Sequence, residues 1–183
     1  KQYEKLWRYL EYKYCKEKSI TDAERAKRIV FTKLVGVMMN VGCRVKECLG
    51  LQWNEVYANP LDDAEKRKVN MLVKIRRENS KTGKGRVVAA PIRGRIDIIK
   101  REQMKLGLEC KPTDFIFANP SSKDGKPYTR ENIANRFRYA LKQSGLQEEF
   151  DREGMVVTLY SCRHTWITWR LVYGNVPLHL LAE

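Results

Sequence analysis

The chain has 183 residues, of which 43% are hydrophobic, so it is long enough to bury a core and too apolar to be disordered. No stretch approaches the roughly 20 apolar residues of a membrane-spanning helix, and the N-terminus lacks the pattern of a secretory signal. Its 36 Lys and Arg outnumber 22 Asp and Glu, and the resulting net charge of +14 predicts a polyanionic partner.

The positive charge is concentrated in one part of the chain. Between Asp63 and Lys105 there are fourteen basic and five acidic residues, a local net charge of +9. Such a segment is typical of proteins that bind nucleic acid. A soluble basic protein without such a partner is the alternative. A membrane surface fits less well, because the charges lie on strand-like rather than amphipathic helical sequence.

The cysteines indicate a reducing compartment. There are five, an odd number, without a Cys-x-x-Cys pair and without a histidine at ligand spacing. This pattern predicts free thiols in a cytoplasmic protein and no metal site.

The N-terminal part of the chain is predicted to be helical. Apolar residues recur at helical spacing in residues 1–18. Thr21-Asp-Ala-Glu24 is a capping box that begins a second helix. Gly42 interrupts this helix, and a short third helix is predicted over residues 45–49.

The pattern then changes to that of strands. Short strands are predicted over residues 53–57, 69–76 and 86–90, with a turn of sequence Asn-Ser-Lys-Thr-Gly-Lys-Gly at 79–85. One side of the second strand is entirely apolar. We therefore expect three antiparallel strands with one face open to water.

Helical periodicity returns after the strands. It predicts a helix around residues 96–106, followed by a short buried segment at 115–117 and a loop at 119–127. A further helix is predicted to begin at Thr129 and to end at Gly145.

The last helices complete the fold class. Thr158 is predicted to cap a helix that runs to Gly174, and Pro177 to open one more. The expected class is α+β, mostly helical with a small three-stranded antiparallel sheet.

Three separated basic residues are the candidates for chemistry. Arg44 lies at a helix start with Glu47 three residues on, and Lys81 lies in the glycine-containing turn. Arg163 lies beside His164 in the last long helix. Brought together, residues of this kind can clamp a phosphate, because a guanidinium fork meets two phosphate oxygens.

Each candidate also has a plainer interpretation. Arg44 and Glu47 could form an ordinary ion pair on a helix surface. Lys81 could be a solvated loop charge, and the neighbouring Lys84 could take the role assigned to it. Arg163 could be a buried arginine that serves a backbone carbonyl or an internal carboxylate.

Together the three motifs resemble a known family. Gly-x-Arg-x-x-Glu at 42–47, Lys-Thr-Gly at 81–83 and Tyr-Ser-x-Arg-His-Thr at 160–165 stand in the order typical of the catalytic domain of phage-type tyrosine recombinases. The resemblance covers essentially the whole chain. It implies the fold of the DNA breaking-rejoining enzymes and a single catalytic domain over residues 1–183. This domain would be C-terminally incomplete, with arm- and core-binding domains before residue 1.

The resemblance also implies a mechanism. Arg44 and Arg163 would clamp the scissile phosphate, Glu47 would support the first arginine, and His164 would be a further supporting residue. Lys81 would protonate the leaving 5′ hydroxyl when a tyrosine attacks the DNA to form a 3′-phosphotyrosyl link. No metal or cofactor is implied, because positive charge stabilises the phosphorane-like transition state.

Two departures from the family lie beside the arginines. Tyr160 stands three residues before the second arginine, where the family usually has histidine. A phenol is a poor base at neutral pH but a good hydrogen-bond donor, so we expect Tyr160 to hold a phosphate oxygen or to orient the nucleophile. Cys43 replaces an aliphatic residue and is expected to be a packing variation.

A third departure concerns the nucleophile, which in the family follows the second arginine by roughly thirty residues. Here 20 residues follow Arg163. Tyr173 is too early and is expected to pack on its helix, and His179 is early for the family's later histidine or tryptophan. The nucleophilic tyrosine is therefore expected beyond Glu183.

The expected partner is double-stranded DNA, contacted by Lys74, Arg76, Lys84 and Arg86 around the turn. The family implies self-association on DNA, as a tetramer in the full-length protein. It also implies integration or excision of a phage or mobile element, in the cytoplasm and at the nucleoid of a bacterial or phage-infected cell. The alternatives are a non-catalytic DNA-binding module and a type IB topoisomerase-like relaxing enzyme, which the compact motif spacing fits less well.

Overall fold

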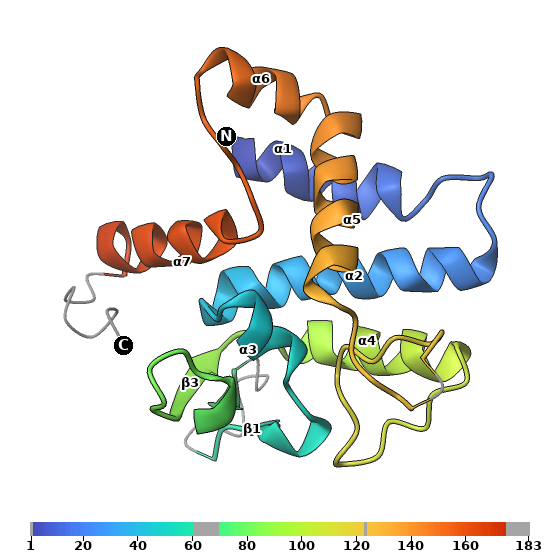
Figure 1. Cartoon of the computed structure of the whole chain (residues 1–183), viewed down its shortest axis with the longest axis vertical. Helices are drawn as coiled ribbons and strands as arrows, with labels where there is room; N and C mark the ends of the chain where they lie inside the picture. Colours follow the sequence, from blue (N-terminus) through green and yellow to red (C-terminus); the bar gives the residue numbers. More distant parts are fainter. Residues whose placement is uncertain (1, 61–69, 123, 175–183) are drawn as a thin grey trace.

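The computed structural model (Figure 1) describes residues 2–60, 70–122 and 124–174. Its helices are α1 (Gln2–Arg8), the π-helix η1 (Tyr9–Tyr14), α2 (Asp22–Val41), α3 (Val45–Leu49), the 3-10 turns η2 (Trp53–Glu55) and η3 (Arg77–Asn79), α4 (Arg93–Lys105), α5 (Arg130–Gln143), α6 (Leu146–Arg152) and α7 (Ser161–Val172). Its strands are β1 (Val56–Ala58), β2 (Met71–Ile75) and β3 (Arg86–Ala90). The longest helix, α2, runs through the middle, with α1 and α6 on one side and α4 and the sheet on the other (Figure 1).

The central helix α2 begins and ends as predicted. The hydroxyl of Thr21 accepts a hydrogen bond from the amide of Glu24 at 3.2 Å. Of the two hydrogen bonds of the predicted capping box, the one to the Thr21 hydroxyl is formed. The Glu24 carboxylate binds Arg28 and Arg136 instead of the Thr21 amide. Gly42 ends the helix in the left-handed conformation, with a φ of 69° that favours glycine.

The first helix ends at Tyr14, earlier than predicted, and its last turns form the π-helix η1. The carbonyl oxygen of Tyr14 accepts a hydrogen bond from Nη1 of Arg28 at 3.0 Å. The Arg28 guanidinium also lies 4.5 Å from the centre of the Tyr14 ring. Because this carbonyl is satisfied by a side chain of α2, the chain can leave the helix here.

The predicted strands form one antiparallel sheet in the order β1-β2-β3. Met71, Val73 and Ile75 of β2 are buried in the core, whereas Lys74 is exposed, which confirms one face open to water. Val69, where the second strand was expected to begin, lies outside the described residues.

The first strand is shorter than predicted. Residues 53–55 form the turn η2, and β1 begins only at Val56. The amide of Gln52 donates a hydrogen bond to the carboxylate of Glu55 at 2.8 Å. This local side-chain contact closes a turn where an extended segment was expected.

Two predicted features of the later helices are confirmed. The hydroxyl of Thr129 accepts a hydrogen bond from the amide of Asn132 at 3.1 Å and begins α5. Gly145 follows the end of α5 in the left-handed conformation, with a φ of 71°. The short helix α6, which starts directly after Gly145, was not predicted.

The start of α7 was predicted wrongly. Thr158 lies three residues before the first helical residue, Ser161. Its hydroxyl accepts a hydrogen bond from the amide of Tyr160 at 3.2 Å, and its amide donates to Oγ of Ser161 at 3.1 Å. Thr158 therefore closes a turn that leads into the helix. Pro177 and His179 lie outside the described residues.

A cluster of buried apolar side chains joins these elements. Phe31 of α2, Phe137 of α5 and Phe117 are among its largest members. Ile116 and Phe117 confirm the predicted buried segment before the loop. Within the described residues, no helix has the length and the hydropathy to cross a membrane.

Candidate active site

The segment between α2 and α3 brings the two candidate arginines together. Arg163 is buried at the start of α7, and its Nη1 donates a hydrogen bond to the carbonyl oxygen of Gly42. This backbone contact is the one that the plainer interpretation of Arg163 describes. Arg44 follows Gly42 by two residues, so one segment positions both guanidinium groups. The indole of Trp166 donates to the carbonyl of Asn40 at 3.0 Å and fastens α7 to the same helix end.

Glu47 anchors the first arginine from a fully buried position. Its carboxylate accepts hydrogen bonds from the amide of Arg44 at 2.8 Å and from Nη1 of Arg44 at 3.0 Å. It also accepts hydrogen bonds from both terminal nitrogens of Arg86, at 3.1 and 2.8 Å. Burial alone would raise the pKa of Glu47, but the hydrogen bonds from Arg86 and Arg44 outweigh it and hold that pKa below its ordinary value.

The turn that carries Lys81 is fastened to the end of α3. The carbonyl of Gly50 accepts hydrogen bonds from Nη2 of Arg76 at 2.9 Å and from the amide side chain of Asn79 at 3.3 Å. Within the turn, Nε of Arg77 donates to the carbonyl of Gly83 at 3.0 Å. The backbone around Lys81 is thus held, while its side chain is exposed.

A cavity of about 680 Å³ lies between α3, the turn, α5 and the start of α7. Its lining residues are Arg44, Val45, Lys46, Asn79, Lys81, Arg130, Ala134, Arg138, Thr158, Leu159 and Tyr160. The structure therefore brings Arg44, Lys81 and Tyr160 to one cavity. Arg163 is buried and does not line the cavity; burial and then the charges of Arg44 and Arg86 lower its pKa. This concentration of positive charge favours an anion.

Two lining arginines were not identified from the sequence. Arg130 and Arg138 of α5 are both exposed, and Ala134 lies between them at helical spacing. The sequence held this signal, because Arg130 and Arg138 stand eight residues apart and therefore share one side of a predicted helix. They extend the basic surface from the turn onto α5.

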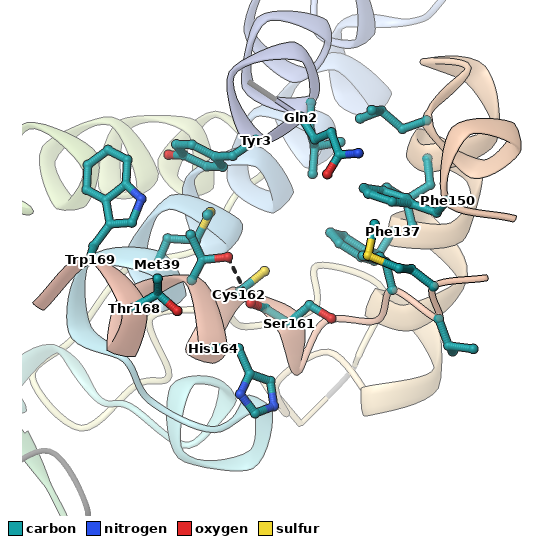
Figure 2. A pocket seen from close by; sticks show the side chains of 17 residues that line it. Gln2, Tyr3, Met39, Phe137, Phe150, Ser161, Cys162, His164, Thr168 and Trp169 are labelled. Carbon is teal, nitrogen blue, oxygen red and sulfur yellow. Dashed lines mark hydrogen bonds between the residues drawn. The ribbon is translucent and has the colours of Figure 1, made fainter. Parts of the chain in front are cut away.

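His164 lies near Tyr160 but does not line this cavity. The two rings meet edge to face, with their centroids 4.8 Å apart. His164 borders a second, mainly apolar cavity of about 560 Å³ between α1, α5, α6 and α7. Figure 2 shows its imidazole on the side of α7 that faces away from Tyr3 and Phe150. His164 can therefore support the position of the Tyr160 ring.

The four residues expected to contact DNA fall into two groups. Lys74 on β2 and Lys84 in the turn are exposed. Arg76 is bound to Gly50 and forms an ion pair with Glu55 at 2.8 Å. Arg86 is bound to Glu47, as described above.

The five cysteines are free and buried. Burial raises the pKa of Cys162 to about 12 and the pKa of Cys48 well above its ordinary value. Cys43 is fully buried beside Arg44, as expected for a packing variation. In the part of the chain that the structure describes, no group of three or more His, Cys, Asp or Glu side chains is arranged to hold a metal ion.

The cavity gathers three arginines, two lysines and the phenol of Tyr160, an arrangement that favours an anionic ligand, and a mostly helical fold with a small sheet presents them. The chain belongs to the phage integrase family, which it matches over residues 1–183. This confirms the resemblance that the three motifs carry.

Solved structures have the same fold. The XerH site-specific recombinase bound to difH substrate, a pre-cleavage complex, has a TM-score of 0.67 and 19% identity, over 98% of this chain and 43% of that chain. The post-cleavage complex of XerH with palindromic difH has a TM-score of 0.63 and 17% identity, over 94% of this chain and 40% of that chain. The chain therefore spans less than half the length of these recombinases. No curated protein matches it by sequence.

Proposed function

We propose that the protein carries out site-specific DNA recombination, integration or excision, by cleaving and rejoining strands through a 3′-phosphotyrosyl intermediate. The observation that carries the proposal is the cavity shared by Arg44, Lys81 and Tyr160, with Arg163 bound to Gly42, two residues before Arg44. Membership of the phage integrase family supports the same reaction class.

Each residue has a role that its position supports. Arg44 keeps one rotamer through Glu47 and binds a non-bridging oxygen of the scissile phosphate. Arg163 uses one of its five N–H donors on Gly42 and offers others to the same phosphate. As the tyrosine hydroxyl releases its proton to water and its oxygen bonds to phosphorus, the bond to the 5′ oxygen breaks and Lys81 gives its proton to that oxygen. Tyr160 donates a hydrogen bond to a phosphate oxygen.

The attacking tyrosine is proposed to lie beyond Glu183. The family's spacing of roughly thirty residues after the second arginine supports this placement. Tyr173, just after α7, does not line the cavity; it is 77% exposed, and its expected packing is limited to an edge contact with Trp169, with the ring centroids 6.0 Å apart. Domains that read the DNA arm and core are proposed to precede this one. The full-length protein is proposed to act as a tetramer on DNA at the bacterial nucleoid.

Double-stranded DNA is proposed to cover the cavity and the basic residues around it. Lys74 and Lys84 would contact the backbone from the sheet side, and Arg130 and Arg138 from α5. Arg76 shares its guanidinium with Gly50 and Glu55 and would contribute mainly through its charge.

A nicked suicide substrate tests the proposal. A protein extended beyond Glu183 is expected to form a covalent adduct with it, and the same protein with Arg163→Ala is expected to form none. DNA binding without an adduct from any extended protein would favour a non-catalytic DNA-binding module. Relaxation of supercoiled DNA without a specific site would favour a type IB topoisomerase-like enzyme.

A further inference from the structure

We propose, on the basis of the function proposed above, that Arg86 is a positioning residue. It aligns the first catalytic arginine, Arg44, with the general acid, Lys81, and it does so through Glu47 rather than by touching DNA. This replaces the DNA-contact role that its place on a basic strand suggested.

The first argument is the way in which two arginines share one carboxylate. Oε1 of Glu47 accepts hydrogen bonds from Nη1 of Arg44 at 3.0 Å and from Nη1 of Arg86 at 3.1 Å. Oε2 accepts hydrogen bonds from the backbone amide of Arg44 and from Nη2 of Arg86, both at 2.8 Å. Each oxygen is therefore shared between the two residues. Without Arg86, half of the contacts that fix this buried carboxylate are lost, and Arg44 loses its rigid partner.

The second argument is the place of Arg86 in the chain. It is the first residue of β3, five residues after Lys81, on the strand that returns from the turn. The outgoing side of the turn is fastened to the carbonyl of Gly50 by Arg76 and Asn79. Glu47 lies within α3 and Gly50 follows its end, so both sides of the turn are fastened to the helix that Arg44 begins. Arg86 provides the fastening on the return side.

The third argument is accessibility. The Arg86 side chain is 17% exposed, and both of its terminal nitrogens are committed to Glu47. Arg86 is also absent from the lining of the cavity that Arg44 and Lys81 share. Two of the five N–H donors of Arg86 are already used on Glu47 and little of the side chain is exposed, so a phosphate binds more readily at the exposed Lys84.

A change of leaving group separates positioning of Lys81 from other roles. A DNA substrate with sulfur in place of the 5′ bridging oxygen releases a thiolate, whose ordinary pKa of ~8.5 makes a general acid unnecessary. Arg86→Lys keeps the charge but cannot form the two parallel hydrogen bonds to Glu47. The full-length protein with this change is expected to cleave the ordinary substrate, with oxygen at the 5′ bridging position, roughly 10- to 100-fold more slowly. Most of this loss should be recovered with the sulfur substrate, while the Kd for DNA changes less than about twofold.

Arg136→Lys is the matched control, because Arg136 also forks onto a carboxylate, that of Glu24, away from the cavity. Its cleavage rate, measured on folded protein, should equal that of the parent with both substrates. Should Arg86→Lys fail to fold, Glu47→Gln tests the same link, because it keeps the size of the side chain and weakens both arginine contacts. Because Glu47→Gln also weakens the contact with Arg44, only part of its loss is expected to be recovered with sulfur, and no recovery at all would remove the role in positioning Lys81.

Three results would overturn the proposal. Cleavage by Arg86→Lys at the rate of the parent would show that the paired hydrogen bonds from Arg86 to Glu47 are not needed. Weaker DNA binding with unchanged cleavage of the bound substrate would make Arg86 a DNA contact. Slow cleavage of both substrates by Arg86→Lys would show that Arg86 does not act by positioning Lys81. An absence of adduct from the parent protein with either substrate would instead contradict the proposed function itself.

Discussion

The Nη1 of Arg163 donates a hydrogen bond to the carbonyl oxygen of Gly42, two residues before Arg44. The segment between α2 and α3 therefore carries one arginine as a side chain and holds the other through its backbone. The ring of Trp166 covers Gly42 from α7, so closely that an added Cβ atom would lie 2.4 Å from it. The spacing of the two guanidinium groups thus depends on a few residues at the end of one helix.

Gly42→Ala is expected to destabilise the protein by about 2 to 4 kcal/mol and to weaken DNA binding. The φ of 69° disfavours any side chain, and the new methyl group would push against Trp166 and shift Arg163. Urea unfolding and a DNA-binding titration measure the two effects. Gly154→Ala is the control, because Gly154 has a φ of 66° with no atom within 4 Å of the added Cβ. It should lose only about 1 kcal/mol and keep its DNA affinity. Equal losses for both variants would contradict a role for the Trp166 contact.

Glu47→Gln is expected to lower the free energy of unfolding at pH 7 by about 3 kcal/mol, because two arginines lose a buried carboxylate. The pKa of Glu47 in the folded protein lies below its ordinary value of 4.5. Its contribution is therefore fully present above pH 4.5 and is lost as the pH falls through the depressed folded pKa.

Urea unfolding of the parent and of Glu47→Gln across this pH range should show the difference between them shrinking in acid. Glu78→Gln, at a carboxylate that is 68% exposed, should match the parent at every pH. A difference between parent and Glu47→Gln that does not depend on pH would show that the carboxylate charge is not what stabilises the site.

Local signals in the sequence predicted much of the fold. Thr129 and Gly42 mark the ends of helices by their own hydrogen bonding and backbone conformation, and the residues of β2 alternate as a half-buried strand does. The signals failed where a nearby side chain competed for the backbone. Glu55 closes a turn where a strand was expected, and Thr158 forms a turn before α7.

The candidate site was predictable only in part. Arg44, Lys81 and Arg163 stand in short motifs, so they could be chosen; the structure places Arg44 and Lys81 at one cavity and Arg163 outside its lining, bound to Gly42. The pairing of Arg86 with Glu47 joins residues 39 positions apart, and no local pattern encodes such a contact. A basic residue on a strand has the same appearance in sequence whether it binds DNA or a buried carboxylate.

The cysteines are expected to be unreactive in the native protein. All five are buried, and burial raises the pKa of Cys162 to about 12, so little thiolate forms at pH 8. An aromatic disulfide reagent should label none of them rapidly in the folded protein and all five in denaturant. Prior treatment with a reducing agent controls for oxidation. Rapid native labelling of Cys162 or Cys48 would show that α7 separates readily from the end of α2.

Arg130 and Arg138 are expected to bind DNA phosphates from α5, because both are exposed and both line the cavity beside Arg44. Replacing either with alanine should weaken binding to all DNA sequences alike and should reduce the slope of log K against log salt by about 1. Fluorescence anisotropy at several salt concentrations measures this slope. Arg152→Ala, an exposed arginine of α6 outside the cavity, should leave it unchanged. If all three variants had the parent slope, the DNA would have to reach Arg44 and Lys81 without passing α5. If one of them weakened binding to a single sequence only, that arginine would contact a base rather than a phosphate.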